Sequence, residues 1–124
     1  MSTLSIAAVV IGLVGVGHSV LGELLIFRQL RGGGVLPDQP APPLRLRHVR
    51  ILWATWHIAS VFGWGLVAVV WRIANAPGAD IAGFAVQATG VSACVSAALV
   101  LFATGGRHPG WIGLLAAALL MFIA

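Results

Sequence analysis

Charged side chains are scarce in this sequence: only 8% of its 124 residues are Asp, Glu, Lys or Arg, whereas 60% are hydrophobic. A soluble domain normally carries about a quarter charged residues. So little charge cannot coat a globule in water, which excludes a soluble enzyme, a disordered chain and a coiled coil. An integral membrane protein remains, in which apolar surface faces lipid.

Lysine is absent, so all seven basic residues are arginines, and there is a single cysteine, Cys94. One cysteine cannot form a disulfide within the chain, so cysteine usage gives no information about a redox compartment. In a soluble protein the formal net charge of +4 would suggest nucleic acid, but no basic residues alternate with aromatic ones here. We therefore expect a lipid bilayer, and no nucleic acid, as the partner of the arginines.

Four apolar segments occupy approximately residues 4–27, 51–72, 81–104 and 109–124. A helix rises about 1.5 Å per residue, so about 20 residues cross the roughly 30 Å hydrocarbon layer. The pattern predicts one all-α domain over residues 1–124, an antiparallel integral-membrane bundle of four transmembrane helices. Its long connection, 28–50, contains glycines and then prolines, which is typical of irregular structure. Four short helices enclose little volume, so we expect a homodimer or a larger membrane complex.

The arginines are distributed unevenly between the connections. Only Arg72 lies in the second loop, and the rest lie in the first and third. By the positive-inside rule, loops 1 and 3 are cytoplasmic and both termini lie outside, as in a multi-pass protein of a bacterial-type plasma (inner) membrane. The arginines expected to contact lipid head groups are Arg28, Arg31, Arg45, Arg47, Arg50 and Arg107.

Small and polar residues of the first apolar segment gather on one helical face. On a wheel of about 100° per residue, Gly15 and Gly22 share an arc with Ser19 and Glu23, and larger apolar residues lie opposite. Small residues let helix backbones approach closely, and polar side chains in a bilayer face the protein interior. We therefore expect His18, Ser19 and Glu23 to point into the bundle.

Glu23 is the only acidic residue inside a predicted span. A carboxylate at that depth costs a few kcal/mol unless it is paired, protonated or hydrated. Two interpretations are open. Glu23 either bonds Arg28, Arg50 or Arg107 and fixes the packing, or it binds a proton or a cation.

The second apolar segment carries an aromatic and polar stripe that lies within about 40° of one line on a helical wheel. The stripe includes Trp53 and Trp64, and an indole N–H in the middle of a span needs an acceptor. His57 lies on the same line, at a depth between those of His18 and Glu23. We predict that these side chains meet in one cavity in the cytoplasmic half of the bilayer. The predicted ligand- or proton-binding set is His18, Ser19, Glu23, His57, Ser60 and Trp64.

Several functions suit this set. The leading hypothesis is binding or transport of a proton, a cation or a small solute, with Glu23 as the titrating group. His18, His57 and Glu23 are also a candidate transition-metal site, because imidazole and carboxylate groups are common ligands. One alternative is a redox protein that binds haem through both histidines or a quinone on Trp64. Another is a structural or assembly subunit without a ligand. Catalytic residues are not expected, since the sequence has no Ser-His-Asp set and no G-x-S-x-G motif.

Overall fold

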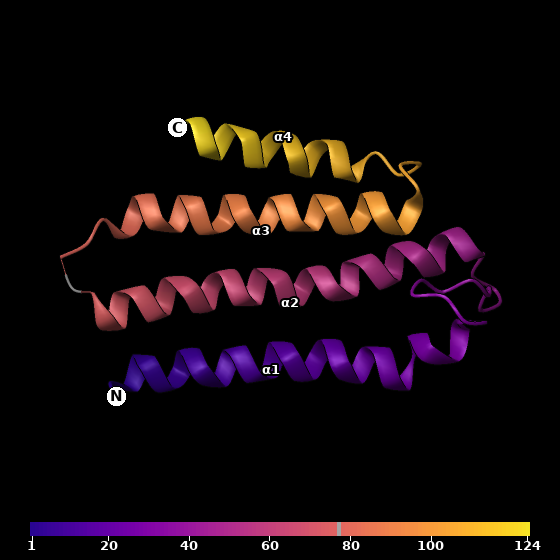
Figure 1. Cartoon of the computed structure of the whole chain (residues 1–124), viewed down its shortest axis with the longest axis horizontal. Helices are drawn as coiled ribbons and strands as arrows, with labels where there is room; N and C mark the ends of the chain where they lie inside the picture. Colours follow the sequence, from indigo (N-terminus) through magenta and orange to yellow (C-terminus); the bar gives the residue numbers. More distant parts are fainter. Residues whose placement is uncertain (77) are drawn as a thin grey trace.

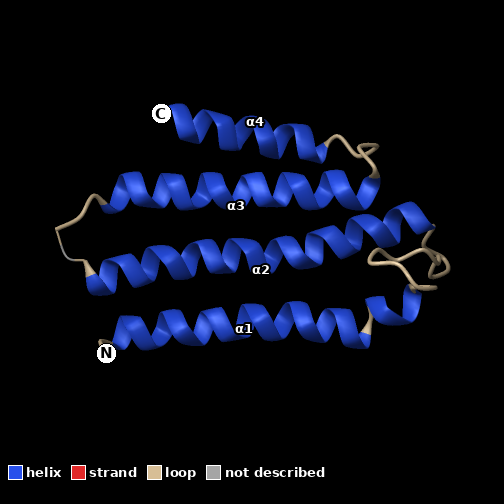
Figure 2. Ribbon diagram, viewed as in Figure 1, coloured by secondary structure: helices blue, strands red, loops and turns tan. Residues whose placement is uncertain are grey.

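The computed structural model describes residues 1–76 and 78–124, and these form an all-helical chain (Figures 1 and 2). The α-helices α1, α2 and α3 are long and apolar enough to cross a membrane, and α4 is a shorter apolar helix. This agrees with the predicted helical class and with the predicted number of helices. Pro77, in the predicted second loop, lies outside the described residues. The elements are α1 (Thr3–Leu25), a 3₁₀ helix η1 (Phe27–Leu30), α2 (Leu46–Asn75), α3 (Ile81–Thr104) and α4 (Gly110–Ile123).

The helix bounds differ most from the prediction at α2, which begins five residues before the apolar segment and extends to Asn75. Its 30 residues are about 45 Å long, more than the hydrocarbon thickness. Arginine is a good helix former, so the helix continues into the polar segment even though the apolar run has ended. α1 ends at Leu25, two residues early, and η1 then turns the chain.

α3 matches its predicted range because both of its ends carry clear capping signals. The Asp80 carboxylate accepts a hydrogen bond of 2.9 Å from the Gly83 N–H, which is a common N-terminal cap. At the other end Gly105 adopts the left-handed conformation, with φ of 57°, which glycine tolerates without a steric cost. This ending sets the direction of the short connection to α4.

Consecutive helices lie side by side in chain order, and α1 and α4 are at the two edges of the row (Figure 1). Within 1–76 and 78–124, extensive contacts join α1 to α2, α2 to α3 and α3 to α4. The helices therefore pack against one another as expected of a bundle, but each contacts mainly its neighbours in the sequence, so that they form a row. Both termini lie at one end of the molecule, and the first and third connections lie at the other.

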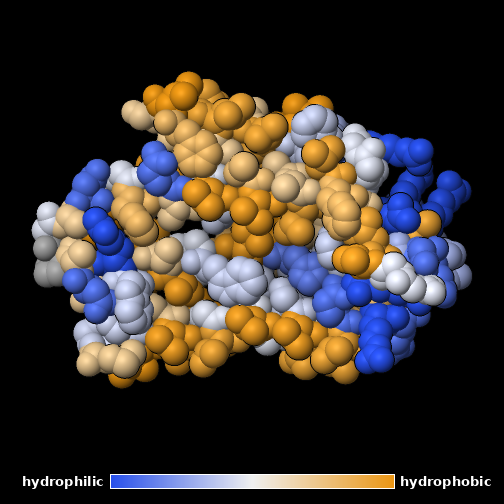
Figure 3. All heavy atoms as spheres, in the orientation of Figure 1, coloured by the Kyte–Doolittle hydropathy of each residue, from blue (hydrophilic) through white to orange (hydrophobic). Residues whose placement is uncertain are grey.

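The small-residue face of α1 packs against α2, as the helical wheel predicts. Ser5, Ala8, Gly15 and Gly22 are the buried residues of α1, whereas large apolar residues on its other side, such as Leu13, are exposed. Figure 3 shows hydrophilic residues gathered at the two ends of the molecule, with hydrophobic residues along much of the surface between them. Such a surface suits a chain with three apolar helices of spanning length.

Gly22→Ala is expected to destabilise the protein by about 1–3 kcal/mol, the usual cost of overpacking. A Cβ at Gly22 would collide with the indole of Trp56, whereas a Cβ at Gly17 would meet nothing within 4 Å. The matched control Gly17→Ala should therefore be neutral or slightly stabilising, because alanine favours a helix. Reversible unfolding of both variants in mixed micelles measures the difference, and equal stabilities would contradict this packing.

Candidate functional site

Three donors from two parts of the chain, α2 and the segment after η1, converge on the carboxylate of Glu23. Its Oε1 accepts hydrogen bonds from the indole N–H of Trp53 and from His57 Nε2, the latter at 2.9 Å. Its Oε2 forms an ion pair with Arg31, which follows η1. The side chains are 27% exposed for Glu23, 20% for Arg31 and 15% for His57, so this carboxylate is held mainly by protein groups.

A chain of hydrogen bonds continues from His57 along the α1–α2 interface. His57 Nδ1 lies 3.0 Å from Ser19 Oγ, and the Ser19 hydroxyl donates to Ser60 Oγ at 2.8 Å. The Ser60 hydroxyl donates in turn to the backbone carbonyl of Gly15 at 3.0 Å. The chain therefore runs from Glu23 to Gly15 and alternates between α1 and α2.

The direction of these bonds fixes where the hydrogens lie. A carbonyl can only accept, so Ser60 must donate to Gly15, and Ser19 must then donate to Ser60. Ser19 has no second hydrogen to donate. His57 Nδ1 must therefore carry a hydrogen and donate it in the bond that Ser19 Oγ accepts. At the other ring nitrogen one proton lies between His57 Nε2 and Glu23 Oε1. Arg31 and Trp53 also donate hydrogen bonds to this carboxylate.

The same residues border an open groove of about 330 Å³ between α1 and α3, over the surface of α2. Ser19, Glu23 and His57 form its polar strip. The remaining lining is aromatic or aliphatic and consists of Trp53, Val61, Trp64, Val95 and Leu99. A small solute with an apolar body and one hydrogen-bonding edge would match this lining.

Two further indoles of α2 donate to backbone carbonyls of α1. The Trp56 N–H bonds to the His18 carbonyl at 2.9 Å, and the Trp64 N–H bonds to the Gly12 carbonyl at 3.3 Å. An indole N–H in the middle of an apolar helix thus finds the acceptor that it needs. These bonds fix the rotation of α1 against α2, and with it the register of the polar chain.

His18 lies apart from the predicted shared cavity. Its ring stacks on Trp56, with centroids 4.3 Å apart and planes 7° from parallel. Its Nε2 is buried without a hydrogen-bond partner among the described residues, and His18 is not part of the groove lining. On α1, His18 and Glu23 are about 140° apart around the helix axis. His18 therefore stacks on Trp56, whereas Glu23 bonds to His57.

This arrangement gives the metal and haem interpretations no support. Within residues 1–76 and 78–124, no group of three His, Cys, Asp or Glu side chains is placed to hold a metal ion. Both ring nitrogens of His57 are engaged, by Ser19 and by Glu23. A metal or haem iron needs an imidazole nitrogen with a free lone pair, so His57 would have to leave the hydrogen-bond chain to act as a ligand.

The arginine that pairs with Glu23 is Arg31, and not Arg28, Arg50 or Arg107 as the sequence analysis considers. Because α1 ends at Leu25, η1 turns the chain and returns Arg31 to the carboxylate. Arg28 is exposed on η1, and the Arg50 Nε–H donates to the Pro37 carbonyl at 3.0 Å. Trp53, on the predicted stripe of α2, is a further site residue that was not among the predicted ones.

Comparisons with protein-family models, with curated proteins and with solved structures give no match for this chain.

Proposed function

We propose that the chain is an antiparallel, four-helix integral protein of a bacterial-type inner membrane. Three apolar helices of spanning length support this. The first and third connections, which hold every arginine except Arg72, lie at the same end of the molecule (Figure 1). By the positive-inside rule that end is cytoplasmic and both termini are outside. In this membrane, lipid is the principal partner, and a second copy of the chain would cover more of the exposed apolar surface.

Within this membrane protein, the proposed function is reversible binding of a proton at the Glu23–His57 pair, exchanged with the cytoplasmic side. The observation that carries the proposal is the series of hydrogen bonds that runs from Glu23 through His57 and Ser19 to Ser60. Intramembrane ionisable residues are functional candidates by default. The chain ends at a backbone carbonyl, Gly15, which favours proton exchange from one side over conduction through this chain.

Loss of the proton would change the two hydrogen bonds that link His57 to Ser60 through Ser19. Neutral His57 has a single N–H, and the Glu23 carboxylate can only accept, so Nε2 keeps its hydrogen and Nδ1 becomes an acceptor. The Ser19 hydroxyl then turns from Ser60 to His57. Ser60 loses its donor, and one of the contacts between α1 and α2 is lost. Protonation would therefore be coupled to the packing of the two helices that border the groove.

The proposal is tested by NMR titration of the protein in lipid nanodiscs. Glu23 is the only glutamate in the sequence, so [¹³Cδ]glutamate gives one carboxyl resonance without any substitution. We expect this resonance and the ring ¹⁵N signals of His57 to change together, with one midpoint. A Glu23 signal that never responds, or that titrates independently of His57, would contradict proton sharing. It would favour a structural or assembly subunit instead.

A second candidate function, quinone binding, is favoured by the lining of the groove. Trp53 and Trp64 line the groove beside the Glu23–His57 pair, and Trp64 is 41% exposed. A quinone needs both a flat apolar contact and a proton-bearing edge. A short-chain quinone should then quench tryptophan fluorescence in the wild-type protein. Trp64→Leu should weaken this quenching, whereas Trp71→Leu, which replaces an exposed tryptophan outside the groove lining, should not. Equal quenching in both variants would contradict a specific site.

A further inference from the structure

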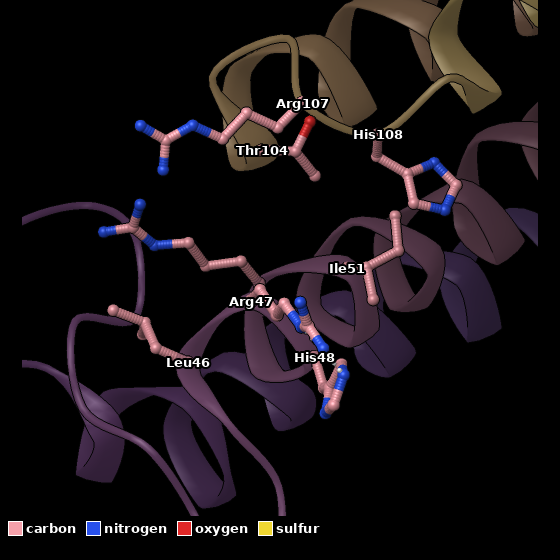
Figure 4. A pocket seen from close by; sticks show the side chains of 8 residues that line it. Leu46, Arg47, His48, Ile51, Thr104, Arg107 and His108 are labelled. Carbon is pink, nitrogen blue, oxygen red and sulfur yellow. Dashed lines mark hydrogen bonds between the residues drawn. The ribbon is translucent and has the colours of Figure 1, made fainter.

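A second and larger cavity, of about 660 Å³, lies between the first turns of α2 and the α3–α4 connection. It is separate from the Glu23–His57 groove, since no residue lines both. Figure 4 shows α2 side chains on one side of its opening and Thr104, Arg107 and His108 on the other. Leu46 and Ile51 add an apolar part to the lining.

The lining carries positive charge without any acidic residue. Arg47, Arg50 and Arg107 contribute guanidinium groups from two separate elements. The chain has three acidic residues, and each has a partner elsewhere. Glu23 pairs with Arg31, Asp38 accepts from the Gly32 N–H, and Asp80 caps α3.

The two histidines of this cavity have defined tautomers when neutral. His48 Nε2 accepts from the Arg47 Nε–H at 3.2 Å, and His108 Nδ1 accepts from the Gly110 N–H at 3.1 Å. The remaining ring nitrogen of each histidine must then carry the hydrogen. Each imidazole that lines the cavity therefore keeps one N–H donor.

We propose that this cavity binds a phosphate group, held between Arg47 on α2 and Arg107 on the α3–α4 connection. Guanidinium groups match phosphate geometry and bind it through paired, charge-assisted hydrogen bonds. The lining offers hydrogen-bond donors and positive charge but no carboxylate, so the complementary ligand is an anion. The phosphate comes either from an anionic lipid head group at the membrane surface or from a soluble phosphate compound, and the test distinguishes these sources.

The experiment measures thermal stability of the full chain in neutral detergent at constant ionic strength. The probes are phosphatidylglycerol, zwitterionic phosphatidylcholine and inorganic phosphate. A ligand that binds the folded state raises the stability with its concentration and gives an apparent Kd. Stabilisation by phosphatidylglycerol alone assigns the lipid source, and stabilisation by inorganic phosphate assigns the soluble source. No stabilisation by either one overturns the proposal.

Substitutions place the phosphate in the cavity. Arg47→Gln and Arg107→Gln, on opposite walls, should each weaken the apparent Kd about 10-fold, the equivalent of one charge-assisted bond of about 1.4 kcal/mol. Arg72→Gln removes the same charge from an arginine that lies over the Phe84 ring, 5.2 Å from its centroid, and should change the Kd less than about 2-fold. Equal weakening by Arg72→Gln would indicate general charge attraction and overturn the site. Unliganded stability and circular dichroism of each variant report whether it folds.

Discussion

Replacement of Glu23 by alanine is expected to destabilise the protein by about 3 kcal/mol. Removal of one member of a largely buried ion pair leaves its partners without compensation, and that cost commonly exceeds the value of the pair itself. Here the substitution leaves Arg31, His57 and the Trp53 N–H without their shared acceptor. Unfolding by a denaturing detergent, followed by circular dichroism, measures the loss.

Two controls separate this effect from a general response to lost charge. Glu23→Gln keeps the shape of the side chain and one acceptor oxygen, so it should cost less than Glu23→Ala. Asp38→Ala removes an exposed carboxylate that accepts a single hydrogen bond, from the Gly32 N–H, and should cost about 1 kcal/mol or less. A similar loss of unfolding free energy for Glu23→Ala and Asp38→Ala would show that the three donors to Glu23 add no stability beyond that of an ordinary exposed hydrogen bond.

Glu23→Gln and His57→Ala are expected to be non-additive, with a coupling free energy of about 1–3 kcal/mol. Each variant removes one side of the same 2.9 Å contact, so the second substitution has less left to disrupt. The double variant should therefore be more stable than the sum of the single losses predicts. A double-mutant cycle on unfolding free energies gives the coupling directly.

His18→Ala supplies the matched control for this cycle. His18 stacks on Trp56 and lies outside the groove, so its effect should add to that of Glu23→Gln within about 0.5 kcal/mol. Coupling of Glu23 to His18 as strong as to His57 would support the cavity shared by both histidines that the sequence predicts. It would contradict the site described here.

The helices could be predicted from the sequence because long apolar runs and capping residues are local signals. The range of α3 follows from its apolar run, Asp80 and Gly105, and the buried face of α1 follows from the spacing of its small residues. The extension of α2 to Leu46 was not predictable from hydropathy. A helix can continue beyond an apolar segment, because its backbone hydrogen bonds are made within the helix itself.

The candidate site was predictable only in part. The wheel brings Ser19 and Glu23 to one face of α1 and His57 and Ser60 to one face of α2, and the structure joins these four side chains in one chain. His18 differs because its ring stacks on Trp56 and does not line the groove. Depth along a helix follows from residue number, whereas contact also depends on how the neighbouring helix is rotated.

The identity of the paired arginine depended on the end of α1. Arg28, five residues after Glu23, is the nearest candidate if the helix continues. The chain instead turns through η1, and Arg31 contacts the carboxylate. The change from α to 3₁₀ geometry has no strong signal in the sequence, since neither proline nor glycine interrupts residues 23–31.

The contact between Glu23 and His57 is the central claim, and solid-state NMR in lipid tests it most directly. Protein made with [¹³Cδ]glutamate and ring-¹⁵N histidine contains a single labelled carboxyl group. We predict a measurable dipolar coupling between this carbon and one histidine nitrogen, because Oε1 of the same carboxyl group lies 2.9 Å from His57 Nε2. The coupling should be lost in His57→Ala but not in His18→Ala. No coupling to any histidine, or coupling that disappears only in His18→Ala, would contradict the site.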